Sequence, residues 1–418
     1  MNPDAPRTPR PGSKGGAAER LQSARVGRRR FLEMGVAAAG AAAAAGALAE
    51  DAVAGHIPPP PSADRPPNAH GLISYEETRL AFRNHGMHLE LLDQPITPLA
   101  SHYQLIHFDI PTLRSDGFQV TVQGRVRKPL TLSLANLKRR QVVHQAVVME
   151  CAGTGRSYAH PRSIYVPWFN EDIGVFRYTG TPLAPILREA GLLGDATEVV
   201  FTGHDAGWDL GIRHHFERAL PVDEAMLDGV ILAWEANGQP LLPAHGFPLR
   251  LIVPTWYGMA SVKWLKAITV IDHPFQGVQQ TQVYRMTFSA SDQGRPIQKK
   301  LVRSSIKPPG EPELLSRHRF VRAGKVTIRG MAWTGTGTIT RVQVSTDNLR
   351  TFRDAVLGPP VDRFAWRPFS FEWNATNGEH VIGSRATDSE GHVQPLRPLW
   401  NIQGMEQHAV ERVGVRVF

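Results

Sequence analysis

The chain has 418 residues, of which 42% are hydrophobic and 20% are charged, and its formal net charge at pH 7 is +9. This length predicts two domains, and the single cysteine, Cys151, excludes an internal disulfide. Residues 1–49 hold eight Lys/Arg and three Asp/Glu, so the remainder carries only +4. Because no basic run with interleaved aromatic residues occurs, we expect no nucleic-acid partner.

The N-terminus has the pattern of an export signal. Arg28-Arg29-Arg30-Phe31-Leu32 precedes an alanine-rich run over residues 34–49 with Ala-x-Ala sites at its end. The paired arginines resemble a twin-arginine signal, so we expect a signal peptide over residues 1–54 and a periplasmic or otherwise exported protein. A membrane helix needs about 20 apolar residues, and this run has 16. An uncleaved membrane tether is the alternative.

A Pro-rich arm is expected over residues 55–75, and a mixed domain over residues 76–284. Short apolar runs predict strands, and longer ones predict helices. The expected strands are 118–123, 198–202, 249–253 and 267–271, and the expected helices are 133–139, 183–190 and 216–220. This pattern indicates an α+β domain. No glycine-rich phosphate loop follows a strand, so nucleotide binding has no support.

Residues 285–418 predict an all-β domain. After a crossing segment over residues 285–310, alternating apolar and polar residues predict strands at 325–329, 340–344, 379–383 and 413–417. Turn residues separate these strands, as in an immunoglobulin-like sandwich. Packing or dimerisation is the expected role of this domain.

Cys151 is the first candidate for chemistry. A lone cysteine is often a buried, inert thiol, but Arg156 follows closely, and nearby positive charge stabilises a thiolate. A nucleophilic cysteine would need a histidine base and an orienting acid, and no local signature supports that reading. Arg250 and Lys263 lie beside apolar runs, where a cation usually needs an anionic partner. Arg83-Asn84-His85 lies in a loop-prone stretch after the Pro-rich arm and means little by itself. Together they suggest a large anionic ligand held at a thiolate.

Several motifs then occur in a characteristic order. They are Arg83-Asn84-His85, Cys151-Ala152-Gly153 with Arg156-Ser157, Asn237-Gly238-Gln239-Pro240-Leu241, His245-Gly246-Phe247-Pro248 with Arg250, and Val262-Lys263-Trp264-Leu265. The set resembles the sulfite oxidase family of molybdopterin enzymes over about residues 78–418. The resemblance implies a molybdenum–molybdopterin cofactor, one molybdenum per chain, with Cys151 as the metal ligand. The implied cofactor-binding residues are Arg83, Asn84, His85, Cys151, Asp205, His245, Arg250, Ser261, Val262 and Lys263.

The resemblance also implies a substrate pocket for a small oxyanion, with Arg83 and Arg156 as pocket arginines. Four sites depart from the family's sulfite enzymes, one of them Thr154-Gly155, which stands where those enzymes have Asn-Arg. Trp234 replaces a tyrosine, Tyr178 replaces a tryptophan and Gln403 replaces a third arginine. Because the cofactor-binding positions match the family, oxidation of sulfite to sulfate is still the expected reaction. Action on another sulfur oxyanion or reduction of an S- or N-oxide is the first alternative, and a non-catalytic binding protein on the same fold is the second.

The expected partners follow from the same resemblance. With one cysteine the chain cannot form a CxxCH haem attachment site, and no second cofactor domain is seen, so we expect no haem. Electrons would then pass to an external acceptor such as a c-type cytochrome. Residues 285–418 resemble the family's dimerisation domain, which implies a homodimer.

Overall fold

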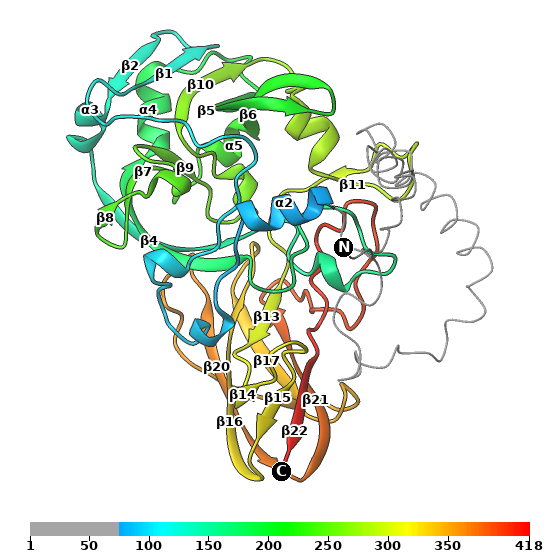
Figure 1. The fold of residues 1–418 in the computed structure, drawn as a ribbon. Helices are drawn as coiled ribbons and strands as arrows, with labels where there is room; N and C mark the ends of the chain where they lie inside the picture. Colours follow the sequence, from blue (N-terminus) through cyan, green and yellow to red (C-terminus); the bar gives the residue numbers. More distant parts are fainter. Residues whose placement is uncertain (1–74) are drawn as a thin grey trace, which may run out of the picture. The chain divides into compact units, whose positions relative to one another are not determined.

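The structure is a computed structural model that describes residues 75–418 (Figure 1). The expected signal peptide and all but the last residue of the expected Pro-rich arm lie outside the described residues. Among residues 75–418, none of the helices has both the length and the apolar character that crossing a membrane requires. The first helix is α2 (Tyr75–Arg83), and residues 84–118 connect it to the first strand of the first sheet.

The first part of the chain contains a five-stranded sheet in the order β2-β1-β10-β5-β6. Its strands are β1 (Gln119–Gly124), β2 (Leu130–Ser133), β5 (Glu198–Asp209), β6 (Ile212–Pro221) and β10 (Leu265–Ile271). β1 runs parallel to β10, and the other pairs are antiparallel. The prediction of a helix at residues 216–220 is wrong, because this segment belongs to β6. Phe216, Arg218 and Leu220 point to the buried face at every second residue, as a strand requires.

Short helices accompany these strands. They are α3 (Leu134–Lys138), α4 (Leu183–Ala190) and α5 (Val222–Ala225). Ser133 and Asn136 cap α3 reciprocally: the Ser133 hydroxyl accepts from the Asn136 amide, and the Asn136 side chain accepts from the Ser133 amide. α3 and α4 match the predicted helices to within a residue or two.

A second sheet places Cys151. Its strands are β3 (Val143–Glu150), β4 (Ile173–Pro182), β7 (Ile231–Ala236) and β8 (Gln239–Pro240), with β9 (Arg250–Ile252) paired to β7. Val147 and Met149 of β3 pack in one apolar cluster with Cys151. Ala146 and Val148, on the opposite face, pack in another cluster with residues of the C-terminal part. β3 is therefore buried on both faces, and Cys151 follows its last residue directly.

The C-terminal part is a sandwich of two sheets. One sheet has four strands: β13 (Arg303–Ile306), β16 (Gly324–Trp333), β20 (Arg367–Ala375) and β19 (Val356–Leu357). The other has six: β14 (Glu311–Pro312), β15 (Arg319–Val321), β22 (Val413–Val417), β21 (Gly378–Asp388), β17 (Ile339–Ser345) and β18 (Arg353–Asp354). The core between them includes Ile328, Val342, Phe371, Ile382 and Val415. All four strands predicted here are present.

A small hairpin of β11 (Arg285–Met286) and β12 (Arg295–Pro296) lies between the two parts in the chain. The fold is thus an α+β domain followed by an immunoglobulin-like β sandwich, as the sequence predicts.

Candidate active site around Cys151

Cys151 begins a tight loop at the end of β3. Its side chain is buried, and its sulfur accepts a hydrogen bond from the Gly153 amide at 3.4 Å. The Thr154 hydroxyl donates to the Cys151 carbonyl at 2.8 Å. A Cβ at Gly153 would lie 2.5 Å from Nη2 of Arg156, so a larger residue here would displace the Arg156 guanidinium. The loop therefore holds the sulfur in one orientation.

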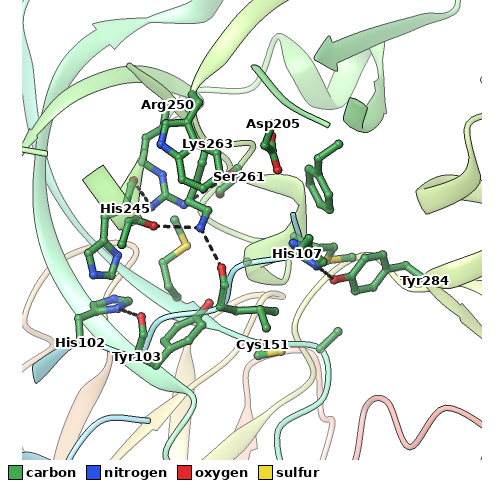
Figure 2. Close-up of a pocket in the computed structure, with 18 residues that line it drawn as sticks. His102, Tyr103, His107, Cys151, Asp205, His245, Arg250, Ser261, Lys263 and Tyr284 are labelled. Atoms are coloured by element: carbon green, nitrogen blue, oxygen red, sulfur yellow. Dashed lines mark hydrogen bonds between the residues drawn. The ribbon is translucent and has the colours of Figure 1, made fainter. Parts of the chain in front are cut away.

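Cys151 lines a pocket with a cavity volume of about 60 Å³ (Figure 2). Segments far apart in the chain supply its walls, and the labelled polar or charged side chains come from six of them. The lining residues are His102, Tyr103, Leu105, His107, Met149, Cys151, Ala152, Asp205, Phe216, Ala244, His245, Arg250, Gly258, Met259, Ser261, Lys263, Trp264 and Tyr284.

Two cations are fixed in the wall by backbone carbonyl groups. Arg250 donates to the carbonyl groups of His245 and Ser261, each at 3.0 Å. Lys263 donates to the carbonyl groups of Leu105 at 2.8 Å and Ala244 at 2.9 Å. Figure 2 shows both side chains pointing into the same region. Because carbonyl groups carry no net charge, these contacts leave the positive charge of Arg250 available to an anion.

Asp205 and Lys263 share the pocket, and burial shifts both. Burial raises the pKa of Asp205 to about 7 and lowers the pKa of Lys263 to about 7, and each side chain favours the other's charged form. Oδ1 of Asp205 has no hydrogen-bond partner among residues 75–418. Buried polar atoms are normally paired, so this carboxylate is suited to receive a ligand donor.

Three histidines line the pocket as neutral rings. Burial lowers the pKa of His102 and of His107 to about 3, and nearby positive charge adds to the effect. Burial also lowers the pKa of His245, and the neighbouring His102 and Arg250 add to this. Near pH 7 these imidazoles therefore donate and accept hydrogen bonds without adding charge.

Cys151 itself is poorly suited to nucleophilic attack. Burial and the neighbouring Asp172 raise the pKa of the thiol to about 12, although Arg156 opposes the shift. A nucleophilic cysteine needs a lowered pKa. A coordinated metal ion deprotonates a thiol regardless, so this environment favours the ligand role.

The predicted Arg83-Asn84-His85 set lies outside the pocket lining. The Arg83 guanidinium is about half exposed and donates to the Phe108 carbonyl at 2.5 Å and to Asp109 at 3.3 Å. The Asn84 amide group donates to the Leu80 carbonyl at 2.8 Å and accepts from the Ile106 amide at 2.6 Å.

His85 is exposed, and its backbone pairs with that of Gln104. This pairing sets the tripeptide beside residues 103–107, and it is these later residues that reach the pocket.

Arg156 and Gln403 are neighbours, but neither is among the lining residues. Buried Arg156 donates from Nε to the Gln403 carbonyl at 2.8 Å and from Nη1 to the Val166 carbonyl at 3.0 Å. The Gln403 side chain donates to the Gln282 carbonyl at 3.3 Å. Both residues support the wall behind the Cys151 loop.

Tyr178, Trp234 and Val262 belong to the apolar core. Arg250 lies over the Tyr178 ring, 5.7 Å from its centroid, and Lys138 lies 5.9 Å from the Trp234 ring centroid. Of the predicted site residues, the structure brings Cys151, Asp205, His245, Arg250, Ser261 and Lys263 together in the pocket wall.

Sequence reasoning missed four polar residues of the wall, namely His102, Tyr103, His107 and Tyr284. The ring nitrogen Nε2 of His107 lies 2.6 Å from the Tyr284 hydroxyl, and both residues line the pocket (Figure 2). They are 177 residues apart in the chain. Neither residue lies within or beside any of the sequence motifs, so the sequence held no signal for them.

Two known domain families match successive parts of the chain. Residues 107–279 match the oxidoreductase molybdopterin binding domain, and residues 295–417 match the Mo-co oxidoreductase dimerisation domain. The crystal structure of the sulfane dehydrogenase SoxCD from Paracoccus pantotrophus superposes with a TM-score of 0.67 at 25% identity, covering 86% of this chain and 96% of that one.

Curated relatives match over most of the chain. The mitochondrial sulfite oxidase of Homo sapiens is 31% identical over 352 residues, 78% of this chain and 63% of that protein. The sulfite oxidase of Gallus gallus is 30% identical, covering 77% of this chain and 73% of that protein. A nitrate reductase from Hordeum vulgare is 29% identical, covering 77% of this chain and 39% of that protein. The chain spans less than two thirds of the human and Hordeum vulgare relatives. It belongs to the sulfite oxidase family of molybdenum oxidoreductases.

Proposed function

We propose that this chain oxidises sulfite to sulfate at a molybdenum–molybdopterin cofactor held by Cys151. The observation that carries the proposal is the single buried thiol at a pocket whose walls hold Arg250 and Lys263. A soft thiolate suits molybdenum, and fixed cations suit both a pterin phosphate and a small oxyanion.

The residues present fit this cofactor. The unpaired Oδ1 of Asp205 can accept from the amine or amide groups of a pterin, and the unpaired Nε of Arg250 can donate to a phosphate or a ring carbonyl. His245, Lys263 and the backbone of Ser261-Val262 lie in the same wall or directly behind it. When bound, the cofactor supplies the two-electron oxygen-atom transfer. The protein binds and orients it and excludes water.

Sulfite is proposed because the matched sulfite oxidases cover most of the chain. The substituted positions Trp234, Tyr178 and Gln403 do not line the pocket, so they give less reason to abandon sulfite than the sequence suggested. The similarity to the sulfane dehydrogenase SoxCD favours a second candidate, oxidation of another reduced sulfur compound. The nitrate reductase similarity keeps reduction of an oxide as a further alternative.

The remaining parts of the proposal concern the cell. The twin-arginine pattern at residues 28–32 supports export to the periplasm, and the match to a dimerisation domain supports a homodimer. Electrons would leave to an external acceptor such as a c-type cytochrome, because we expect the chain to bind no haem.

The test is molybdenum content and turnover together. Protein matured with the cofactor should contain about one molybdenum per chain and should reduce cytochrome c or ferricyanide with sulfite. Cys151→Ser should abolish this turnover, and Arg213→Met, at an exposed site, should leave it unchanged. Turnover with thiosulfate or nitrate but not sulfite would select an alternative substrate. A folded protein without molybdenum would support the non-catalytic reading.

A further inference from the structure

Arg218 is a buried cation directly behind the pocket. It lies on β6, its side chain is 1% exposed, and its Cζ lies 5.3 Å from the ring centroid of Tyr284. Tyr284 lines the pocket, and its hydroxyl meets His107 on the other side (Figure 2). The phenol is therefore held between a guanidinium against its ring and an imidazole at its hydroxyl.

The charge of Arg218 is not neutralised within the protein. Its Nη1 donates to the Gln279 carbonyl, whereas Nε and Nη2 have no hydrogen-bond partner among the residues that the structure describes. Arg303, by contrast, lies 3.5 Å from a carboxylate. Burial lowers the pKa of Arg218 to about 10, with the Tyr284 phenol as an opposing influence, so the side chain is still a cation at pH 7.

A buried charge without a counter-ion is costly and is rarely kept unless it serves a site. The Tyr284 ring faces Arg218, and the Gln279 carbonyl accepts from its Nη1. The neutral imidazole of His107 meets the Tyr284 hydroxyl and stacks on Phe216 with ring centroids 4.4 Å apart. None of these groups cancels the charge. Its field therefore extends through these rings into the pocket, where protein screening is weaker than in water.

We propose that Arg218 is a positioning residue that orients Tyr284 and supplies the uncompensated positive charge by which the pocket holds a small oxyanion. The ring of Tyr284 stacks on the guanidinium, a contact that fixes the phenol toward the pocket. The inference rests on the oxyanion substrate class of the proposed function. Arg218 adds its charge from behind the pocket wall, without touching the substrate.

The test measures anion binding without turnover. Sulfate is titrated calorimetrically into the holoenzyme, and Arg218→Met is compared with Arg213→Met. Arg213 lies on the same strand but is exposed. Removing a buried charge close to the site should weaken sulfate binding by at least about tenfold. Arg213→Met should bind sulfate as the wild type does. In turnover, Arg218→Met should raise KM more than it lowers kcat.

Equal sulfate affinity in Arg218→Met and the wild type would overturn the proposal, as would a wild type that does not bind sulfate. If Arg218→Met does not fold, Arg218→Gln, which keeps a donor for the Gln279 carbonyl, is used in its place. Loss of folding in both variants would show that the charge serves the core and would also overturn it. Sulfate binding that depends on Arg218 in a protein inactive toward sulfite would leave this inference standing and remove the proposed substrate.

Discussion

The guanidinium of Arg303 lies 3.5 Å from the carboxylate of Glu150, the residue that precedes Cys151. Arg303 belongs to β13 of the sandwich, and Glu150 ends β3. The same guanidinium donates to the Asn170 side chain at 2.7 Å and to the Gln407 carbonyl at 3.0 Å. Trp333, also in the sandwich, donates to Glu150 at 2.7 Å. The C-terminal domain therefore fixes the strand whose end leads directly to Cys151.

Arg303→Met should destabilise the protein strongly. The substitution leaves the Glu150 carboxylate buried without its partner, which typically costs about 3–5 kcal/mol. The free energy of unfolding, measured in urea, should fall by that order, and the molybdenum content should fall with it. Arg329→Met, at an exposed site on β16, is the control and should change the free energy of unfolding by less than about 0.5 kcal/mol. If Arg303→Met is as stable as the wild type and binds full molybdenum, the sandwich does not support the site through Arg303.

Asp205→Asn should loosen the cofactor. The unpaired carboxylate oxygen would no longer offer a charged acceptor, and charged hydrogen bonds contribute about 1.5–3 kcal/mol. We therefore expect a cofactor affinity lower by roughly tenfold or more, measured as the loss of molybdenum during dialysis. Asp116→Asn, in an exposed loop, is the matched control. Equal retention by both variants would remove Asp205 from the binding set.

Tyr284→Phe and Trp234→Phe should change different properties: the first should change KM for sulfite, and the second should change the free energy of unfolding. Tyr284→Phe deletes the hydroxyl that meets His107 in the pocket, so KM for sulfite should rise while stability changes little. Trp234→Phe makes a gap in the core, so it should lower the free energy of unfolding by about 1–3 kcal/mol and leave KM unchanged. If instead Trp234→Phe raises KM and Tyr284→Phe does not, Tyr284 does not contribute to the substrate pocket. Trp234 would then contact the substrate, as the sequence predicted.

The buried His102 predicts acid sensitivity. Its pKa falls from 6.5 to about 3 on folding, mainly through burial, so between these values the unfolded chain binds a proton that the folded chain does not. The contribution of neutral, buried His102 to the free energy of unfolding is complete above pH 6.5. It is lost as the pH falls from 6.5 to 3, at about 1.4 kcal/mol for each pKa unit.

His102→Phe, which keeps a ring against Phe176, should therefore flatten the fall in unfolding free energy between pH 6.5 and 4, and the exposed His88→Gln should not. Identical pH slopes in the wild type and His102→Phe would contradict the assignment.

Local patterns were enough to predict much of the fold. The strands of the sandwich and helices α3 and α4 follow from periodicity and capping, which depend on neighbouring residues. The segment 216–220 was misread because five residues do not distinguish a helix from a strand. Its assignment to β6 depends on pairing with β5, from Glu198–Pro221 to Asp209–Ile212.

Likewise, one part of the site follows from local motifs and the other part depends on tertiary contacts. His245, Arg250, Ser261 and Lys263 lie within 19 residues of one another, and their motif places them in one wall. Arg83 lies outside the pocket lining because the pairing of His85 with Gln104 brings residues 103–107, and not 83–85, to the pocket, and this pairing cannot be read from the sequence. The contact of His107 with Tyr284 likewise depends on the tertiary fold.

The most direct test is X-ray absorption at the molybdenum edge of the wild type and of Cys151→Ser. The account predicts that molybdenum in the variant has one fewer sulfur neighbour than in the wild type, together with loss of sulfite turnover. The same number of sulfur neighbours in both proteins would contradict the central claim that Cys151 binds the metal.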